Sequence, residues 1–273
     1  MGYDLRATKI VLEALSDTGY LLKEGKLFGL SAQTRELFVE KASPDYAANS
    51  FLHSWSLVKR WLTIPDVLKT GQPTERKRTP QELEHFIGAM DEGSRDTASY
   101  IVKLCLEQAP ETKSVLDIGG GPGTYAKIFA QYGVNVTLFD LPDVVDLISE
   151  EFKEHELITP VSGDFNLKLP SGLFDLAFLG NICHIYGPEQ NIALFKRVAQ
   201  VLNAKGTIAI LDFVRGCSPR AFLFAVNMLV NTESGGTWTE EEYRSWLTES
   251  GFQNFRLWDI EERAAQLILA QLG

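Results

Sequence analysis

The sequence predicts an α/β protein, in which a mostly parallel β-sheet is covered on both faces by helices and follows a smaller α+β module. Two observations carry this prediction. From residue 113 onward, short apolar segments alternate with segments of helical period, as in parallel strands joined by crossover helices. Before residue 80 the order is different, because one amphipathic helix is followed at once by two short strands.

The N-terminal module is predicted from three short segments. Residues 6–17 have apolar side chains at helical spacing. Residues 20–23 and 26–31 flank a Glu-Gly turn and predict a β-hairpin. A helix that leads directly into a hairpin is typical of the second half of a winged helix. We therefore expect residues 1–78 to form a partial, winged-helix-like α+β domain.

A linker separates this domain from the rest of the chain. Residues 46–62 are aromatic-rich and helical in period, and we expect them to pack between the two parts. Residues 70–80 contain a glycine, two prolines and a run of charges, which is typical of a linker. Thr79 is the expected N-cap of the next helix, since a proline and then Glu82 follow at the spacing of a capping box. The second domain is therefore predicted to span residues 79–273.

The second domain begins with a helix or helix pair at about 80–109. Apolar strands are predicted at 114–118, 134–139, 174–179, 207–212, 254–259 and 265–271, with a weaker one at 157–161. Helices are predicted between them at about 123–132, 143–153, 189–203 and 239–250. No helix separates the last two strands, so we expect them to pair antiparallel through a short turn near Glu261.

The composition excludes several classes of protein. Of the 273 residues, 45% are hydrophobic and 23% charged, as in ordinary globular proteins. We expect no membrane association, because no apolar run approaches ~20 residues and no secretory signal is visible. The net charge of −10 argues against nucleic acid as a partner. Cys105, Cys183 and Cys217 lack metal-ligand spacing, so we expect reduced thiols, a cytoplasmic location and no metal site.

The most informative stretch is Asp117-Ile118-Gly119-Gly120-Gly121-Pro122-Gly123, which lies between a predicted strand and a predicted helix. Glycines let the backbone approach a ligand closely, and the helix N-terminus beyond them favours a nucleotide cofactor. The dinucleotide fingerprint has G-x-G-x-x-G spacing, whereas these glycines alternate and an acid precedes them. This spacing resembles the first motif of S-adenosylmethionine-dependent methyltransferases. On its own, it is also compatible with a structural turn.

Further polar residues follow other strand ends, which meet at the same edge of such a sheet. Asp140 lies about 20 residues after the glycine loop, where an acid accepts hydrogen bonds from both ribose hydroxyls. Asp164 is placed to accept from an adenine amino group and Phe165 to contact the ring, although Gly-Asp is also a common turn. His184 is well placed as a general base, with Asp212 to orient its imidazole. Taken alone, a histidine at a strand end is more often structural.

Together, these segments make residues 80–273 similar to the plant and bacterial small-molecule O-methyltransferases, of the caffeate, hydroxyindole and polyketide-tailoring type. The matching segments are 116–123, 139–144, 163–165, 182–184 and 251–252. The resemblance implies a Rossmann-like S-adenosylmethionine (SAM) methyltransferase fold, with a mostly parallel seven-stranded sheet whose last strand is antiparallel. It also implies SAM as cofactor, S-adenosyl-L-homocysteine (SAH) as product, and a hydroxylated small molecule as acceptor. The winged-helix domain of that family serves dimerisation rather than DNA binding.

The resemblance further implies a set of site residues. His184 and Asp212 are the expected catalytic pair. The expected cofactor contacts are Ser94, Asp117, Gly119, Gly121, Asp140, Leu141, Asp164, Phe165 and Asn181. The expected acceptor wall consists of Phe86, Met90, Phe224, Asn227, Met228 and Asn231, although the run at 222–228 is equally compatible with a core helix.

Three departures from the family pattern leave the methyl acceptor open. Gly180 stands where many plant members have a lysine that holds the cofactor carboxylate. Ile185 stands where the family often has an acid, and Trp238 lies near the place of a second catalytic glutamate. Without these acids the site offers less base assistance, which is enough for an acidic phenol as acceptor but is also compatible with methyl transfer to a carbon atom.

The N-terminal helices that dimerise the family are largely missing, which leaves a homodimer as an open expectation. Two rival classes of function also remain. An NAD-dependent oxidoreductase fits the general order of strands and helices, but not the alternating glycines. A winged-helix DNA-binding regulator with a ligand-sensing α/β domain is favoured only by the slightly basic N-terminal part, in which residues 76–78 are Arg-Lys-Arg.

Overall fold

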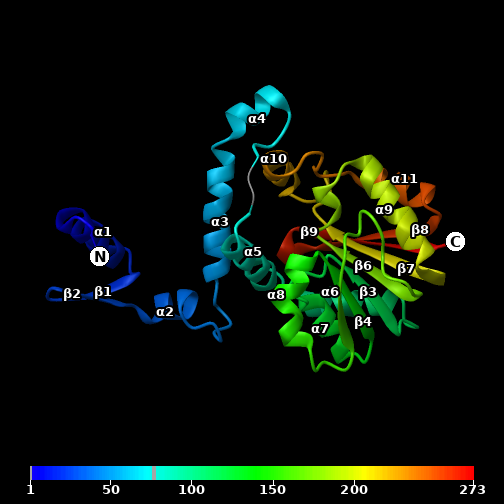
Figure 1. Ribbon diagram of the computed structural model, residues 1–273, viewed down its shortest axis with the longest axis horizontal. Coiled ribbons are helices and arrows are strands. Elements are labelled where there is room, and N and C mark those ends of the chain that lie inside the picture. The colour runs from blue at the N-terminus through cyan, green and yellow to red at the C-terminus, as the bar shows by residue number, and fades with distance from the viewer. Residues whose placement is uncertain (1, 76–77) are drawn as a thin grey trace.

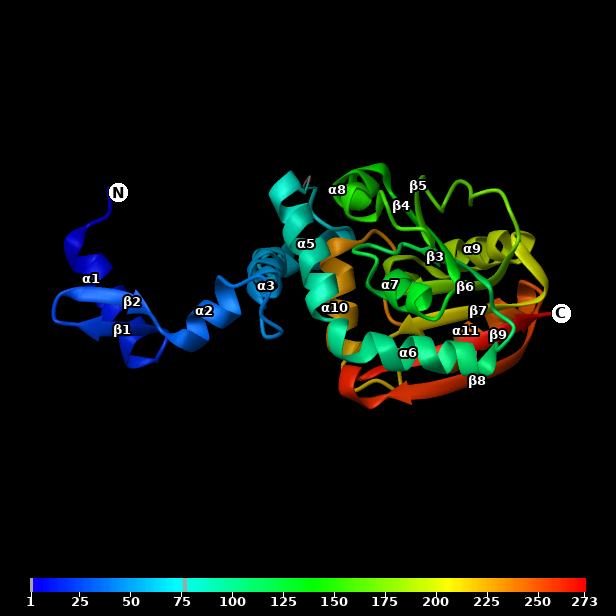
Figure 2. The ribbon, with the colours of Figure 1, turned by 90° about the horizontal axis from the view of Figure 1, so that it is seen from below.

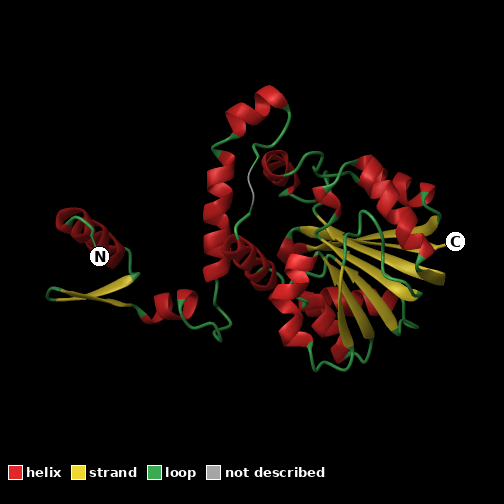
Figure 3. Cartoon of the chain, viewed as in Figure 1, coloured by secondary structure: helices red, strands yellow, loops and turns green. Residues whose placement is uncertain are grey.

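A computed structural model describes residues 2–75 and 78–273. Its centre is a seven-stranded sheet with the order β5-β4-β3-β6-β7-β9-β8 (Figures 1 and 3). The strands are β3 (Ser114–Ile118), β4 (Asn135–Asp140), β5 (Ile158–Ser162), β6 (Phe174–Gly180), β7 (Leu202–Asp212), β8 (Phe252–Ile260) and β9 (Ala265–Leu272). Pairs among β3 to β7 are parallel, while β9 runs antiparallel to both of its neighbours. The predicted sheet and its antiparallel hairpin are thereby confirmed.

Helices cover both faces of the sheet because successive side chains of a buried strand point to opposite sides. Val115 packs with α6 (Arg95–Gln108), α7 (Thr124–Gln131) and α8 (Pro142–Phe152) in one core. Leu116, the next residue, packs with α9 (Pro188–Gln200) and α11 (Glu240–Glu249) in the other. The helix predicted at 189–203 ends earlier, at Gln200, because β7 already begins at Leu202.

The helix pair before the sheet consists of α5 (Pro80–Glu92) and α6, which are separated at Gly93-Ser94. The predicted capping box is confirmed: Thr79 Oγ1 accepts from the backbone of Glu82, whose carboxylate accepts from the backbone of Thr79. Part of the predicted linker, residues 76–77, lies outside the described residues.

The N-terminal segment forms the predicted helix and hairpin as α1 (Leu5–Asp17), β1 (Leu21–Glu24) and β2 (Leu27–Leu30). It continues into α2 (Ala32–Phe38) and lies to one side of the sheet domain (Figure 2). The short helices α2 and α4 (Ile64–Thr70) were not predicted, because seven residues are too few to establish a helical period. The predicted aromatic helix is α3 (Ala48–Trp61), which packs on α5 and on α10 (Ala221–Asn231).

Within the described ranges, no helix is long and apolar enough to cross a membrane. Across the same residues, no group of three or more histidines, cysteines or acids is placed to hold a metal ion.

Candidate active site

A cavity of about 880 Å³ opens at the carboxyl edge of the parallel strands. Its walls come from α5, the glycine loop, the end of β4 with the first turns of α8 (Pro142–Phe152), the loop after β5, and the end of β6 with the loop that follows it. Ligands of open α/β sheets bind at this edge, because the loops that follow neighbouring strands converge there. The sequence prediction of a site at the carboxyl edge therefore agrees with where the cavity lies.

The glycine loop turns the chain from β3 into α7 along the cavity wall. Gly119 and Gly121 have φ angles of 67° and 52°, in the left-handed region that glycine adopts without strain. A Cβ atom on Gly119 would collide with the side chain of Ile182. A Cβ atom on Gly121 would meet nothing closer than 3.9 Å, so the space beside this residue is open. The loop thus presents bare backbone to a ligand.

Asp117 lies at the base of this loop and is only 1% exposed. Its Oδ2 atom has no hydrogen-bond partner among the described residues, which is rare for a buried carboxylate oxygen. Burial, with a smaller contribution from the negative charge of Asp140, raises the pKa of Asp117 to about 8. An unpartnered buried acid that lines a cavity suits a cationic ligand group, because a positive charge would satisfy it.

Asp140 ends β4 and is held by two backbone N–H groups. Gly121 N donates to Oδ2 at 2.8 Å and Leu141 N donates to Oδ1 at 2.7 Å. Burial is the main cause that raises the pKa of Asp140, and these two hydrogen bonds oppose it. Each carboxylate oxygen accepts two hydrogen bonds, so this fixed side chain has capacity left for two hydroxyl groups.

Two polar residues complete this end of the cavity. Asn181 follows β6 in the left-handed conformation, with a φ angle of 61°, and its buried Oδ1 has no partner among the described residues. A non-glycine residue held in this conformation is often part of a binding site. Ser94 lines the cavity between α5 and α6, and its Oγ donates to the carbonyl of Met90 at 2.7 Å.

A buried histidine–aspartate pair is formed by His184, in the 3-10 turn after β6, and Asp212, the last residue of β7. His184 Nδ1 is 2.7 Å from Asp212 Oδ1, and the side chains are 7% and 1% exposed. Asp212 also accepts from His184 N at 3.0 Å, Phe213 N at 2.8 Å and Tyr243 Oη at 2.9 Å. With Asp212 fully occupied by donors, Nδ1 of the imidazole carries its proton and Nε2 keeps a lone pair. This is the arrangement of an oriented general base.

Comparison with known proteins decides the family. Residues 69–253 match the family model described as the O-methyltransferase domain. The chain belongs to this O-methyltransferase family. It is 34% identical to acetylserotonin O-methyltransferase of Macaca mulatta over 272 residues, which cover 89% of this chain and 78% of the relative. It is 26% identical over 273 residues to the tetracenomycin polyketide synthesis 8-O-methyl transferase TcmO of Streptomyces glaucescens, which cover 93% and 80% of the two chains.

The fold also agrees with solved structures of other proteins. The structure of human N-acetylserotonin methyltransferase in complex with SAM superposes with a TM-score of 0.82. The superposition covers 99% of this chain and 84% of that one, at 23% sequence identity. The predicted family, enzyme class and fold are thereby confirmed.

In this O-methyltransferase, most of the expected cofactor contacts line the cavity. They are Ser94, Asp117, Gly119, Gly121, Asp140, Leu141, Phe165 and Asn181, together with Phe86 and Met90 from the expected acceptor wall. Asp164 is the exception, since it is absent from the cavity wall. Its Oδ1 instead accepts from Asn166 N at 2.8 Å, which is the common Gly-Asp turn that the sequence also allowed.

The O-methyltransferase's other expected acceptor residues lie on α10, outside the lining of the cavity. Phe224 packs edge-on against His184, with 4.7 Å between ring centroids. Met228 is buried at 6% exposure. Asn227 Oδ1 accepts from Trp61 Nε1 at 3.3 Å, and Asn231 Oδ1 accepts from Arg60 Nε at 3.2 Å. These two asparagines join α10 to α3, and neither lines the cavity, so their role towards an acceptor stays a prediction.

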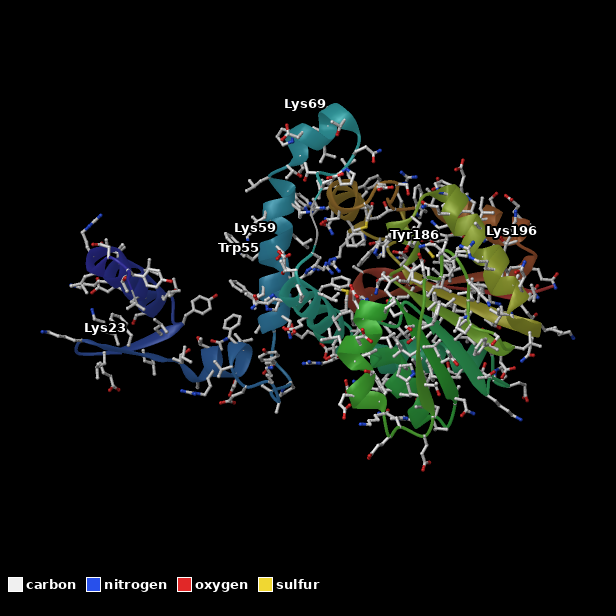
Figure 4. The ribbon with its side chains drawn as sticks, viewed as in Figure 1. Lys23, Trp55, Lys59, Lys69, Tyr186 and Lys196 are labelled. Atoms are coloured by element: carbon white, nitrogen blue, oxygen red, sulfur yellow. The ribbon has the colours of Figure 1, made fainter. Side chains whose placement is uncertain are left out.

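Three residues at or beside the site were not predicted from the sequence. Tyr243, on α11, donates to the catalytic carboxylate from a segment that carries no motif. Tyr186 lines the cavity with its ring edge-on to Phe165 at 5.8 Å, and it directly follows the Ile-Cys-His-Ile segment, which was the available signal (Figure 4). Arg263 donates to Ser94 Oγ at 3.1 Å from the turn between β8 and β9.

The segment around Trp238 explains how the enzyme fills the place of the missing acid. Trp238 Nε1 donates to the carbonyl of Cys183 at 3.2 Å, and its ring packs against Trp246 with 5.4 Å between centroids. The tryptophan therefore braces the loop that carries His184, while offering no second base.

Proposed function

We propose that this enzyme transfers a methyl group from SAM to a hydroxyl group of a small phenolic or polyketide-type molecule. The observation that carries the proposal is the juxtaposition of the cavity, with its glycine loop and unpartnered Asp117, and the His184–Asp212 pair just after β6 and at the end of β7. Family membership and the SAM-bound human structure support SAM as the donor. SAM supplies an activated methyl group on a sulfonium, so no protein nucleophile is required.

The cavity residues fit such a donor by their chemistry. Asp117 would pair with a positively charged group of SAM, which supplies the partner that its Oδ2 atom lacks. Asp140 would bind the two ribose hydroxyls, and the Phe165 ring would contact the adenine. Ser94 and Asn181 would bind the polar methionine end. The open backbone at Gly121 allows a close approach.

His184 would remove the proton of the acceptor hydroxyl through Nε2. Asp212 holds the imidazole in the tautomer that leaves this nitrogen unprotonated, and it stabilises the imidazolium that forms. Such assistance is typically worth ~10²–10⁴ in rate. Phe224 closes one side of the imidazole and limits access of water to it. Alignment of the acceptor oxygen with the methyl group contributes the remaining acceleration.

The test combines binding with turnover. Calorimetry should detect SAM and SAH but not NAD, and radiolabelled SAM should transfer its methyl group to members of a phenolic panel. His184→Ala should lose ~10²–10⁴ in turnover and keep its SAM affinity. NMR of the product identifies whether the methyl group sits on oxygen or on carbon. Binding of NAD in preference to SAM, or unchanged turnover in the variant, would contradict the proposal.

We also propose that residues 1–78 form a domain that pairs with a second copy of this chain. This segment exposes large apolar side chains, among them Leu5 (82%), Leu27 (76%), Phe51 (63%), Trp55 (57%) and Leu62 (77%). Helix α1 has no buried residue at all. Figure 4 shows Trp55 and Lys59 on the side of α3 that is turned away from the sheet. Exposed apolar side chains of this number and size favour a protein interface.

The oligomeric state tests this pairing. Analytical ultracentrifugation should find a dimer for the wild type, a monomer for Trp55→Glu, and a dimer for the control Lys69→Gln at the exposed tip of α4 (Figure 4). A monomeric wild type at micromolar concentration contradicts the pairing. We further propose a cytoplasmic location, which the three unpaired cysteines support.

A further inference from the structure

Among the residues that the structure describes, Arg78 is the one cation that lines the cavity, and the other charged residues of the wall are acidic. The guanidinium of Arg78 lies 4.3 Å from the centroid of the Phe86 ring, and both residues belong to the cavity wall. Within residues 2–75 and 78–273, no carboxylate forms an ion pair or hydrogen bond with Arg78. The acids that share this wall are Glu84 on α5, Asp117 and Asp140 near the ends of β3 and β4, and Asp143 and Asp146 on α8.

The surroundings of Arg78 are electropositive. His53, from α3, packs edge-on against Phe86 with 5.4 Å between ring centroids, so Phe86 contacts the side chains of both Arg78 and His53. Arg60, also from α3, is close enough that its charge helps to lower the pKa of Arg78, after desolvation as the main cause. The pKa of His53 is also lowered, mainly by desolvation and to a smaller extent by the charges of Arg78 and His85. Each of these groups therefore destabilises positive charge on its neighbours, and an anion placed among them would relieve that repulsion.

The geometry favours a flat ligand with a carboxylate. Arginine binds carboxylates through two parallel N–H groups, and a guanidinium stacked on an aromatic ring is held in one plane. The residue keeps access to solvent at the mouth of the cavity, so it is reachable by a small molecule. Glu84 also lines the cavity, but it is exposed and forms no ion pair with Arg78.

We propose that Arg78 is a specificity-determining residue that binds a carboxylate on the methyl acceptor, so that the preferred acceptors are aromatic hydroxy acids. The inference rests on the proposed function, because it assigns the acceptor class for that same cavity. The phenol of such an acceptor would be directed towards His184, and its acid group would lie between α3 and α5. This arrangement orients the acceptor from both ends.

The test compares matched acceptors in matched variants. Each phenolic acid is paired with its primary amide, which has nearly the same shape and no charge. The variants are Arg78→Gln, Arg78→Lys and the control Lys69→Gln, which removes one positive charge from α4 outside the cavity. The readouts are KM and kcat for each acceptor at saturating SAM, the Kd of the acid for SAH-loaded enzyme, the Kd of SAH, and the melting temperature.

The wild type should prefer the acid to the amide. Arg78→Gln should raise KM and Kd for the acid by about 10- to 100-fold, as expected for loss of a charge-assisted hydrogen bond. The kcat for the acid, and the KM and kcat for the amide, should change little. Arg78→Lys should retain part of the preference, because it keeps the charge but not the planar fork. Lys69→Gln should behave as wild type in every readout.

Three outcomes would overturn the inference: equal effects of Arg78→Gln on acid and amide, a wild-type preference for the amide, or weakened SAH binding in Arg78→Gln. The last outcome would place Arg78 in the donor site instead. Failure of the proposed function has a different signature, since no phenol would be methylated by the wild type. The Kd of the acid still measures the role of Arg78 in that case.

Discussion

Replacement of Asp212 by asparagine offers the sharpest test of the catalytic pair. The carboxylate accepts four hydrogen bonds, two on each oxygen, and is fully buried. Asparagine has one acceptor oxygen, so it can serve two of these donors, and its NH₂ group faces the other two. Where that NH₂ group meets His184, the imidazole must present Nδ1 as the acceptor and move its proton to Nε2. The lone pair that removes the acceptor's proton is then lost.

The size of the effect follows from this conflict. Loss of the correct tautomer removes the general base and should reduce kcat by ~10²–10⁴. In that arrangement Phe213 N is left as a buried donor without an acceptor, which should cost about 1–3 kcal/mol of stability and about 2–10 °C in melting temperature. SAM affinity should stay unchanged, because Asp212 is absent from the cavity wall.

The assay measures kcat with radiolabelled SAM, Kd for SAM by calorimetry, and melting by circular dichroism. Raising the pH should not restore the Asp212→Asn variant, since its defect is the position of a proton rather than its removal. Wild-type turnover in a folded variant would refute the role assigned to the pair. A large loss of SAM affinity would show instead that Asp212 supports the donor site.

Three further predictions concern neighbouring parts of the site. Burial raises the pKa of Asp117 to about 8, so binding of SAM at pH 7 should release a proton, seen by calorimetry in buffers of different ionisation enthalpy and absent in Asp117→Asn. This pKa lies above the value of 3.8 in the unfolded chain, so the contribution of Asp117 to the stability of the folded protein is complete below about pH 4 and is lost as the pH rises towards 8. A wild-type melting temperature that does not change with pH, together with a pH-dependent one in Asp117→Asn, would argue against this. Tyr243→Phe removes one of the four donors to the Asp212 carboxylate. It should lower kcat by about 3- to 10-fold and leave the Kd for SAM unchanged, as expected for one hydrogen bond of ~1 kcal/mol. An unchanged kcat would show that the tyrosine has only a structural role. Gly123→Ala should cost more stability than the control Gly133→Ala. Both glycines have positive φ angles (72° and 78°), but only a Cβ atom on Gly123 would collide with Phe152. Equal losses of melting temperature in the two variants would rule out the collision.

The sequence was most informative where a motif and a periodicity coincide. The alternating glycines between an apolar strand and a helix predict the loop at 119–123, and the structure gives three of its glycines positive φ angles. The strands were predictable because buried parallel strands are near-continuous apolar runs. Their ends also indicate where Asp117, Asp140 and Asn181 gather, since all parallel strands of one sheet end at the same edge.

The remaining features depend on contacts between distant segments. Asn227 and Asn231 are polar side chains of the kind that bind an acceptor. Their hydrogen-bond partners come from α3, which lies about 170 residues earlier in the chain. No periodicity within α10 contains that information. Tyr243 reaches Asp212 only because α11 packs against the face of the sheet near the end of β7. Asp164 also makes a contact that is local in sequence, since its Oδ1 accepts from Asn166 N in the turn after β5.

The position of β9 in the sheet has a consequence for how the protein is made. This strand follows all the others in the sequence, yet it lies between β7 and β8 and pairs with both. The turn that leads into it carries Arg263, whose hydrogen bonds to Gly93 and Ser94 span about 170 residues of the chain. The cavity wall at Ser94 therefore gains this contact only after the turn before the last strand has been synthesised. A nascent chain stalled before residue 265 would hold an open sheet, in which β7 pairs with β6 alone and the other edge of β7 is exposed.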